Sequence, residues 1–188
     1  MLSVIIPTHN SERALVQTLA ALVPGATAGV ITEVLIADGG SQDDTAAVAD
    51  VAGCNFLAAD GAALANRLTA AVAAARMRWL MFLRPGTVLD APWTNEIARF
   101  LQQETHQAPA AVFRRGSPQT GIRDVVLAVA MTLGAPPRPE QGLVIARELY
   151  DAVGGHSARA GNPEQELLRR VGQRRIVKLT TPAFGPYT

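Results

Sequence analysis

Short apolar runs rich in β-branched residues alternate with helix-like segments along the first half of this chain. Each run is short enough for a single strand and ends at a proline, a glycine turn or a polar loop. Successive alternations of strand and helix predict a mostly parallel sheet that helices cover on both faces. The strands are expected at Leu2 to Ile6, at Ile31 to Ala37, around Asn55 to Leu57, and at Arg78 to Leu83.

Local signals set the bounds of the remaining elements. Asn10 or Ser11 can cap the first helix, which Pro24-Gly25 is expected to stop. Asp43 and Asp44 are expected to begin the second helix, because negative charge suits the positive end of a helix dipole. Further helices are expected at Ala62 to Arg76, Pro92 to Thr105, Gly121 to Leu133, just before Gly154-Gly155, and at Pro163 to Val171. Further strands are expected at Ala110 to Phe113, Leu143 to Ala146 and Arg174 to Leu179.

The composition excludes several classes of protein. With 188 residues, 48% hydrophobic and 18% charged, the chain fits one compact α/β domain. A net charge of +1 without a dominant basic run argues against nucleic acid as a partner. Arg169-Arg170 and Arg174-Arg175 do cluster, which leaves phosphate or membrane-surface contact open. The single cysteine, Cys54, excludes an intrachain disulfide and a cysteine-based metal cluster.

No segment is typical of a secretion leader or a membrane span. The N-terminus starts at once with strand-like residues. The longest later apolar run, Val125 to Met131, is far shorter than the roughly 20 residues that a span needs. We therefore expect a cytoplasmic protein without a transmembrane segment, with peripheral membrane contact left open.

Ligands of a parallel sheet bind outside the carboxyl ends of its strands. The loops of interest are therefore Pro7 to Asn10, Asp38 to Asp44 and Arg84 to Thr87. A dinucleotide-binding dehydrogenase would need a glycine-rich turn after the first strand, and Pro7 to Asn10 contains no glycine. A P-loop is excluded because Gly-Lys-Ser/Thr does not occur. A nucleotidyltransferase on a related sheet lacks its expected glycine-rich basic loop.

The succession of motifs resembles family 2 glycosyltransferases of the GT-A fold. Val4-Ile-Ile-Pro-Thr-His-Asn10 is similar to the family's first strand and its exit, and Leu35-Ile-Ala-Asp-Gly-Gly-Ser41 is similar to its second. Ala146 to Gly155 resembles the segment that leads into the family's Gly-Gly-Phe turn, and Glu140-Gln141 resembles an acidic-Gln pair upstream of it. Glu164-Gln-Glu-Leu-Leu-Arg-Arg170 resembles its acidic-pair helix. The resemblance is strongest to a short subgroup associated with radical-SAM and selenodomain proteins.

This resemblance implies a fold and a division into halves. We expect one three-layer α/β/α GT-A domain over residues 1–188, with a mostly parallel central sheet. Residues 1–90 would form the nucleotide-binding half, and residues 91–188 the acceptor-side half. The family uses the position of Asp38 to contact the base, although an aspartate there can also cap its own turn. The nucleotide-binding residues implied by the resemblance are Pro7, Thr8, His9, Asn10, Asp38, Gly39, Arg67 and Arg84.

The loop after the fourth strand departs from the family pattern. The family carries an Asp-x-Asp or similar acidic pair there, which holds Mn²⁺ or Mg²⁺ against the leaving diphosphate. This chain has Arg84-Pro85-Gly86 instead, and the nearest carboxylate on the loop is Asp90. We therefore assign no metal ligand. A divalent cation, Mn²⁺ or Mg²⁺, stays open as a cofactor, although its usual ligands are absent from this loop. Arg84 can neutralise a diphosphate by bidentate hydrogen bonds, or it marks a site that has lost activity.

Inverting glycosyl transfer also needs a general base for the acceptor hydroxyl. The resemblance places Glu164 on the family's catalytic acid and Glu166 on a later acid of the same helix. Glu164 has a simpler interpretation, because negative charge in the first turn of a helix compensates its dipole. His156 stands where the family has a phenylalanine, which makes the acceptor-side wall more polar or reflects exposure of this position.

Two functions of different class follow. The first is an inverting glycosyltransferase that uses a UDP- or GDP-linked sugar and an unknown acceptor hydroxyl. The second is a catalytically degenerate GT-A domain that binds a nucleotide or a protein partner without turnover. The Arg-Pro-Gly loop favours the second, whereas the presence of Asp38, Glu164 and Glu166 favours the first.

Overall fold

The computed structural model describes residues 1–102, 109–116 and 136–185. Its strands are β1 (Leu2–Thr8), β2 (Ile31–Asp38), β3 (Asn55–Ala58), β4 (Trp79–Phe82), β5 (Val88–Leu89), β6 (Ala110–Arg115), β7 (Leu143–Ala146) and β8 (Ile176–Phe184). Its helices are α1 (Glu12–Thr27), α2 (Thr45–Val51), α3 (Leu64–Ala74), α4 (Trp93–Gln102), α6 (Arg147–Ala152) and α7 (Pro163–Val171), with the 3₁₀ helices η1 (Pro139–Gln141) and η2 (Gln173–Arg175).

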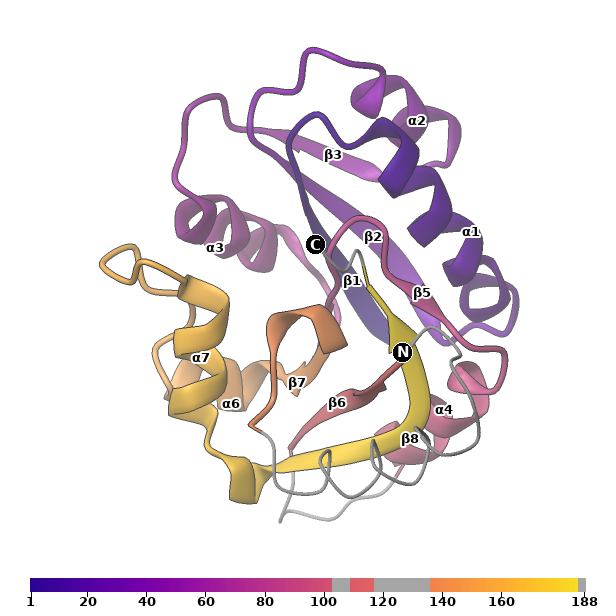
Figure 1. Cartoon of the computed structure of the whole chain (residues 1–188), viewed down its shortest axis with the longest axis vertical. Helices are drawn as coiled ribbons and strands as arrows, with labels where there is room; N and C mark the ends of the chain where they lie inside the picture. Colours follow the sequence, from indigo (N-terminus) through magenta and orange to yellow (C-terminus); the bar gives the residue numbers. More distant parts are fainter. Residues whose placement is uncertain (103–108, 117–135, 186–188) are drawn as a thin grey trace, which may run out of the picture.

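The described strands form one twisted sheet in the order β3-β2-β1-β4-β7-β6-β8-β5 (Figure 1). β1 pairs in parallel with both β2 and β4, and β2 pairs in parallel with β3. β7 is antiparallel to both β4 and β6, whereas β8 is parallel to β6. The mostly parallel sheet is thus confirmed, and its antiparallel pairings gather in the second half of the chain.

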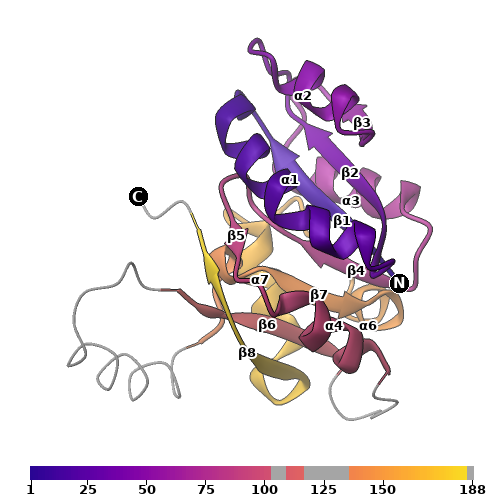
Figure 2. The same cartoon turned by 90° about the vertical axis from the view of Figure 1, so that its right-hand side faces the viewer.

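Helices cover both faces of the sheet and give it three layers (Figure 2). Successive strand residues point to opposite faces, so Val4 and Ile6 enter one core and Ile5 enters the other. The first core also takes Leu15 of α1 and Trp93 of α4. The second core is filled from α3, α6 and α7. The hydrophobic pattern of each strand therefore decides which helices can pack on it.

Four chain segments meet at one edge of the sheet. β1, β2 and β4 run parallel and end there, and Thr8 pairs with Asp38 at the ends of β1 and β2. The Leu83 amide donates to the Ile5 carbonyl at 3.1 Å, so the loop that begins at Arg84 leaves the sheet beside β1. β7 runs antiparallel to β4, and the residues just before it, which form η1, therefore reach the same edge.

Pro24 does not end α1, contrary to the expectation from sequence. The helix continues to Thr27, and the Ala28 amide still donates to the Pro24 carbonyl at 3.0 Å. A Cβ added to Gly25 would lie 2.2 Å from the Trp93 ring, so the last turn packs closely against α4. A proline near the end of a helix removes only one backbone hydrogen bond. The contact of Gly25 with Trp93 outweighs this small loss, so the helix continues.

Most other elements lie close to their expected positions, and the bounds of β7 and α7 are as expected. The final strand is the largest error, because η2 replaces its expected start and pairing with β5 extends it to Phe184. β5 and η1 are additional to the expected elements. The expected helix at Gly121 to Leu133 and the end of the one at Pro92 to Thr105 lie outside the described residues.

Candidate active site

The Asp38 carboxylate is buried and organises the turn that follows β2. Oδ1 accepts hydrogen bonds from the Thr8 hydroxyl at 2.7 Å and the Ser41 hydroxyl at 2.5 Å. Oδ2 accepts from the backbone amides of Gly40 at 2.9 Å and Ser41 at 2.8 Å. A carboxylate has about four acceptor positions, so this turn already occupies them. The geometry supports the turn-capping interpretation of Asp38, and any base contact would involve the loop that it shapes.

The hydrogen bonds around Asp38 also affect its titration. Burial by itself would raise the pKa of Asp38, but the hydrogen bonds from Ser41, Thr8 and Gly40 outweigh it and hold the pKa below its ordinary value. The carboxylate is therefore ionised at neutral pH, and the donors that lower its pKa are hydroxyls and backbone amides.

The loop after β1 is tied to the loop after β2. Asn10, in a left-handed conformation with φ of 49°, donates its amide to the Ser41 hydroxyl at 2.8 Å. Its side-chain oxygen accepts from the Gln42 amide at 2.7 Å, and the Glu12 amide donates to the Asp43 carboxylate at 3.0 Å. These bonds fix the two expected nucleotide-side loops relative to each other. His9 is exposed beside them, and Pro7 is half-buried.

Arg67 of α3 joins the ends of β1 and β2 by hydrogen bonds. Its Nη1 donates to the carbonyls of Thr8 at 2.7 Å and Ala37 at 2.9 Å. A Cβ on Gly39 would lie 2.8 Å from the same Nη1, so the absence of a side chain there makes room for the guanidinium. Its Nε is buried with no hydrogen-bond partner among the described residues. Arg67 therefore supports the loop after β2, and its expected phosphate contact stays a prediction.

Arg84 lies between two glutamates at the carboxyl edge of the sheet. Its Nε and Nη2 donate to Glu164 Oε2 at 3.1 and 2.6 Å, and its Nη1 donates to Glu140 Oε1 at 2.8 Å. The exposed side-chain fractions are 29% for Arg84, 11% for Glu164 and 34% for Glu140. The loop after β4, the 3₁₀ helix η1 and the first turn of α7 thus meet in one charged cluster. We call these three residues the Arg84 cluster.

The Arg84 cluster does not fit the divalent cation that the family resemblance implies. Burial would lower the pKa of Arg84, but the hydrogen bonds and charge of Glu164, with the charge of Glu140, outweigh it and raise the pKa further. A guanidinium that is always charged thus lies against the two glutamates nearest the loop. No group of three or more His, Cys, Asp or Glu side chains suited to a metal occurs in the described parts of the chain.

Each glutamate of the cluster is held by its own element. Gln141 fixes η1, because its side chain accepts from the Arg138 amide at 2.9 Å and donates to the Phe113 carbonyl at 2.7 Å. Asn162 caps α7 by accepting from the Gln165 amide at 3.0 Å. Pro163 follows at the first helical position and Glu164 at the second, so the cap sets where Glu164 emerges.

Glu166 has a different set of partners from Glu164. Its Oε2 accepts from Arg170 Nε at 2.6 Å, four residues along the helix. The other Arg170 nitrogens donate to the carbonyls of Val153 and Gly155. Glu166 thereby positions the arginine that fixes the Gly154-Gly155 turn. The structure brings only Glu164, of the two expected acids, into contact with Arg84.

His156 is buried, so the interpretation of this position as exposed is wrong. Its Nδ1 lies 2.9 Å from the Tyr150 hydroxyl, and its ring packs edge-on against Phe82 with 5.0 Å between centroids. Burial, together with the charge of Arg170, lowers the pKa of His156 to about 4. A small cavity lined by Phe82, His156 and Glu164, among others, connects this ring to the Arg84 cluster.

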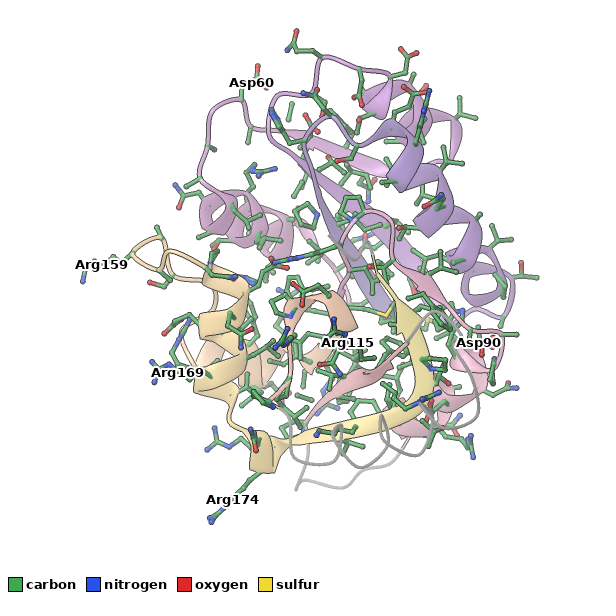
Figure 3. All side chains as sticks on the ribbon, viewed as in Figure 1. Asp60, Asp90, Arg115, Arg159, Arg169 and Arg174 are labelled. Carbon is green, nitrogen blue, oxygen red and sulfur yellow. The ribbon has the colours of Figure 1, made fainter. Side chains whose placement is uncertain are left out.

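The remaining arginines of the C-terminal segment are on the surface. Arg159, Arg169 and Arg174 point outward on the α7 side of the molecule (Figure 3). Arg170 instead donates to the carbonyls of Val153 and Gly155 at the turn. Arg169 is exposed and lies 3.6 Å from the Glu166 carboxylate. The paired sequence Arg169-Arg170 therefore combines a structural arginine with a solvated one.

Comparison with known proteins identifies the family. The model of the family described as Glycosyl transferase family 2 matches residues 3–161, which is most of the chain. The chain belongs to glycosyl transferase family 2. The match ends before α7, so Glu164 and Glu166 lie beyond it. No curated protein matches the chain.

Solved structures of glycosyltransferases share the fold. The chain is similar to S. aureus TarS 1-349, with 17% identity and a TM-score of 0.69, over 98% of this chain and 60% of that one. It is similar to the mannosyltransferase PcManGT from Pyrobaculum calidifontis, with 16% identity and a TM-score of 0.68, over 97% and 56%. Glucosyl-3-phosphoglycerate synthase from Mycobacterium tuberculosis gives 18% identity and a TM-score of 0.70, over 96% and 68%. The GT-A fold is confirmed, although the first two of these proteins are much longer than this chain.

In this family 2 domain, sequence reasoning did not find the residues that contact Arg84 and Asp38. The sequence indicates Glu140 only as part of an acidic-Gln pair, and nothing local shows that η1 brings it to Arg84. Ser41 as a donor to Asp38 could have been inferred, because Asp-x-x-Ser is a common turn pattern. Thr8 could not be inferred in this way, because it lies on β1 and reaches Asp38 only through strand pairing. Among the described residues, no helix combines the length and the apolar character required to cross a bilayer.

Proposed function

We propose that this domain transfers a sugar from a UDP- or GDP-linked donor to an acceptor hydroxyl with inversion. Family membership supports glycosyl transfer, and two of the similar structures are complexes with UDP and with GDP-Man. The observation that carries the proposal is the Glu164 carboxylate, placed by Arg84 at the edge where the nucleotide-side loops end. It is the one expected catalytic acid that the fold brings to this edge.

Each residue has a defined part in this reaction. Glu164 takes the proton as the acceptor oxygen bonds to the anomeric carbon, and the bond from that carbon to the diphosphate oxygen breaks. The electron pair of that bond leaves with the diphosphate. Arg84 has five N–H hydrogens, of which Glu164 and Glu140 accept three, so two remain for the leaving group. No step passes through a metal ion.

The nucleotide would lie over the loops that Asp38 and Arg67 shape. Pro7, Thr8, His9 and Asn10 form one side of this region, and the backbone at Gly39 forms the other. Of these, His9 is the exposed ring that can stack on a base. The short radical-SAM and selenodomain-associated subgroup, a cytoplasmic location and peripheral membrane contact remain predictions from sequence.

The first test is a thermal-shift panel of UDP, GDP and their sugars, with Mn²⁺, Mg²⁺ or EDTA. A ligand at about 100 times its Kd adds roughly 2.7 kcal/mol to the free energy of unfolding, a rise of several degrees in Tm. We expect such a rise with one nucleotide, and we expect EDTA to leave it unchanged. No rise with any nucleotide would contradict the donor site.

Turnover is then measured as release of the nucleoside diphosphate from its sugar donor. Glu164→Gln should abolish release while keeping the thermal shift, because the variant loses the base and keeps a side chain of the same shape. Glu148→Gln on α6, an exposed carboxylate paired with Arg78 at 3.4 Å, is the matched control and should behave as wild type.

A second candidate function has its own support. The salt bridge from Arg84 occupies the proposed base, which suits a domain that binds a nucleotide or a partner without catalysis. Nucleotide binding without any release above the enzyme-free rate, in both wild type and Glu164→Gln, would favour this function over transfer.

A further inference from the structure

The Arg84 cluster carries more negative than positive charge. One guanidinium faces two carboxylates, so the three side chains together have a formal charge of −1. A site that receives the diphosphate of a nucleotide sugar needs positive charge. One of the two carboxylates is therefore in excess when a donor is bound.

Glu140 is the partner that can leave more easily. It makes one contact, through Nη1, and a third of its side chain is exposed, whereas Glu164 accepts from two nitrogens and is nearly buried. Partly exposed ion pairs contribute little to stability, because water replaces the lost partner. Releasing Glu164 would instead leave a buried carboxylate without its cation.

The backbone around Glu140 is fixed, so only its side chain needs to move. Gln141 anchors η1 to the Phe113 carbonyl, and the Gly142 amide closes the turn on the Pro139 carbonyl at 3.1 Å. Rotation of the Glu140 side chain toward solvent frees Nη1 of Arg84. The freed nitrogen and the two N–H hydrogens without acceptors among the described residues then form a donor set for a phosphate oxygen.

We propose that Glu140 is a placeholder for the donor diphosphate: it occupies Arg84 in the free domain and is displaced when the phosphates bind. The inference rests on the proposed function, since it assigns the diphosphate to Arg84. It makes Glu140 a residue that sets donor affinity rather than one that takes part in bond making.

The test is titration calorimetry in EDTA with UDP, GDP, inorganic pyrophosphate, uridine and guanosine. The variants are Glu140→Gln, Arg84→Gln and the double variant, with Glu148→Gln as a control for the same change in net charge. Glu140→Gln should bind the nucleoside diphosphates and pyrophosphate about fivefold more tightly than wild type, because the competing carboxylate is gone. Nucleoside affinity should not change, and neither should any affinity of Glu148→Gln.

The double variant separates a competitor from a structural residue. If Glu140 acts by competing for Arg84, Glu140→Gln gives no gain in the Arg84→Gln background. A gain that persists there would overturn the proposal and indicate a general effect of charge. Unchanged or weaker diphosphate binding by Glu140→Gln, with wild type still binding the nucleotides, would also overturn it and would leave the donor site intact.

Failure of the proposed function gives a different pattern. If no variant binds a nucleoside or a nucleotide, the donor site is absent. If Glu140→Gln nevertheless binds pyrophosphate more tightly than wild type, Glu140 still competes with an anion for Arg84, at a site that is not a nucleotide site. Absence of pyrophosphate binding as well would remove both proposals.

Discussion

Two carboxylate sites at the same edge of the sheet are satisfied in opposite ways. Asp38 accepts four hydrogen bonds from neutral donors, three of which come from within three residues of it in the chain. Glu164 is bound by a guanidinium that lies 80 residues away. The Asp38 turn is thus mostly a local structure, and the Arg84 cluster exists only in the folded chain.

The comparison shows where function can change without loss of fold. A carboxylate that takes most of its hydrogen bonds from its own turn depends little on distant elements. A carboxylate held by a distant cation depends on three separate elements, and its charge balance changes when a ligand binds any member. We therefore expect the Arg84 cluster to respond more strongly than the Asp38 turn to substitution and to pH.

The largest effect is expected from Arg84→Met. The change leaves two carboxylates facing each other, and it should lower the free energy of unfolding by about 3 kcal/mol, at the low end for buried pairs because two members are partly exposed. Urea unfolding at neutral pH measures it. Arg78→Met, which breaks the exposed pair with Glu148, is the control and should cost less than about 1 kcal/mol. Equal losses in the two variants would contradict the contrast.

As the pH falls, we expect the free energy of unfolding to drop first through His156, beside the Arg84 cluster, and only in stronger acid through Asp38. Burial lowers the pKa of His156 from 6.5 to about 4, so we expect its contribution to stability to be full above pH 6.5 and to fall as the pH drops to 4. Because each pH unit is worth about 1.4 kcal/mol, about 2 kcal/mol should be lost by pH 5. His156→Phe should abolish this loss when urea unfolding at pH 7.5 and 5.0 is compared.

Asp38 gives the matching control for that pH experiment. Its pKa is held below the ordinary value of an aspartate, so its contribution to stability is full above that ordinary value and is lost only in stronger acid. Asp38→Asn should therefore keep the whole loss between pH 7.5 and 5.0. A variant in which this loss disappears would show that the two regions are coupled.

A smaller loss is expected from Asp38→Asn at neutral pH. The amide group keeps the shape but puts two N–H donors where four donors converge, so we expect a cost of about 1.5 kcal/mol. Asp50→Asn on the exposed face of α2 should change the free energy of unfolding by less than about 0.5 kcal/mol. Nucleotide affinity of Asp38→Asn should also fall, because the loop after β2 loses its anchor.

The smallest effect is expected from Thr8→Val. The variant removes one of the four donors to Asp38 and keeps the volume of the side chain, which should cost about 1 kcal/mol. Ser41→Ala, which removes a donor to Asp38 and an acceptor for Asn10, should cost somewhat more. The reverse order would mean that the link between the two loops contributes little.

Local sequence signals predicted the parts of the molecule that depend on near neighbours. The alternating strands and helices, the Asp38 turn, the start of α2 and the bounds of α7 all follow from short-range patterns. The pair of Glu166 with Arg170 was also within reach, since residues four apart lie on one helix face. Pro24 is the local signal that failed, because packing of Gly25 on Trp93 outweighed it.

Local patterns in the chain are thus enough for the fold class and for most residues at the carboxyl ends of the strands. Which of these residues touch, and that Glu140 joins them, follows from the folded arrangement. Arg84 could be recognised as a basic residue in an acidic position, but its partners depend on β7 running antiparallel to β4 and on the cap of α7. The burial of His156 was decided in the same way. Propensity and turn chemistry act over a few residues, whereas charge pairing and burial depend on segments that meet only when the whole sheet has formed.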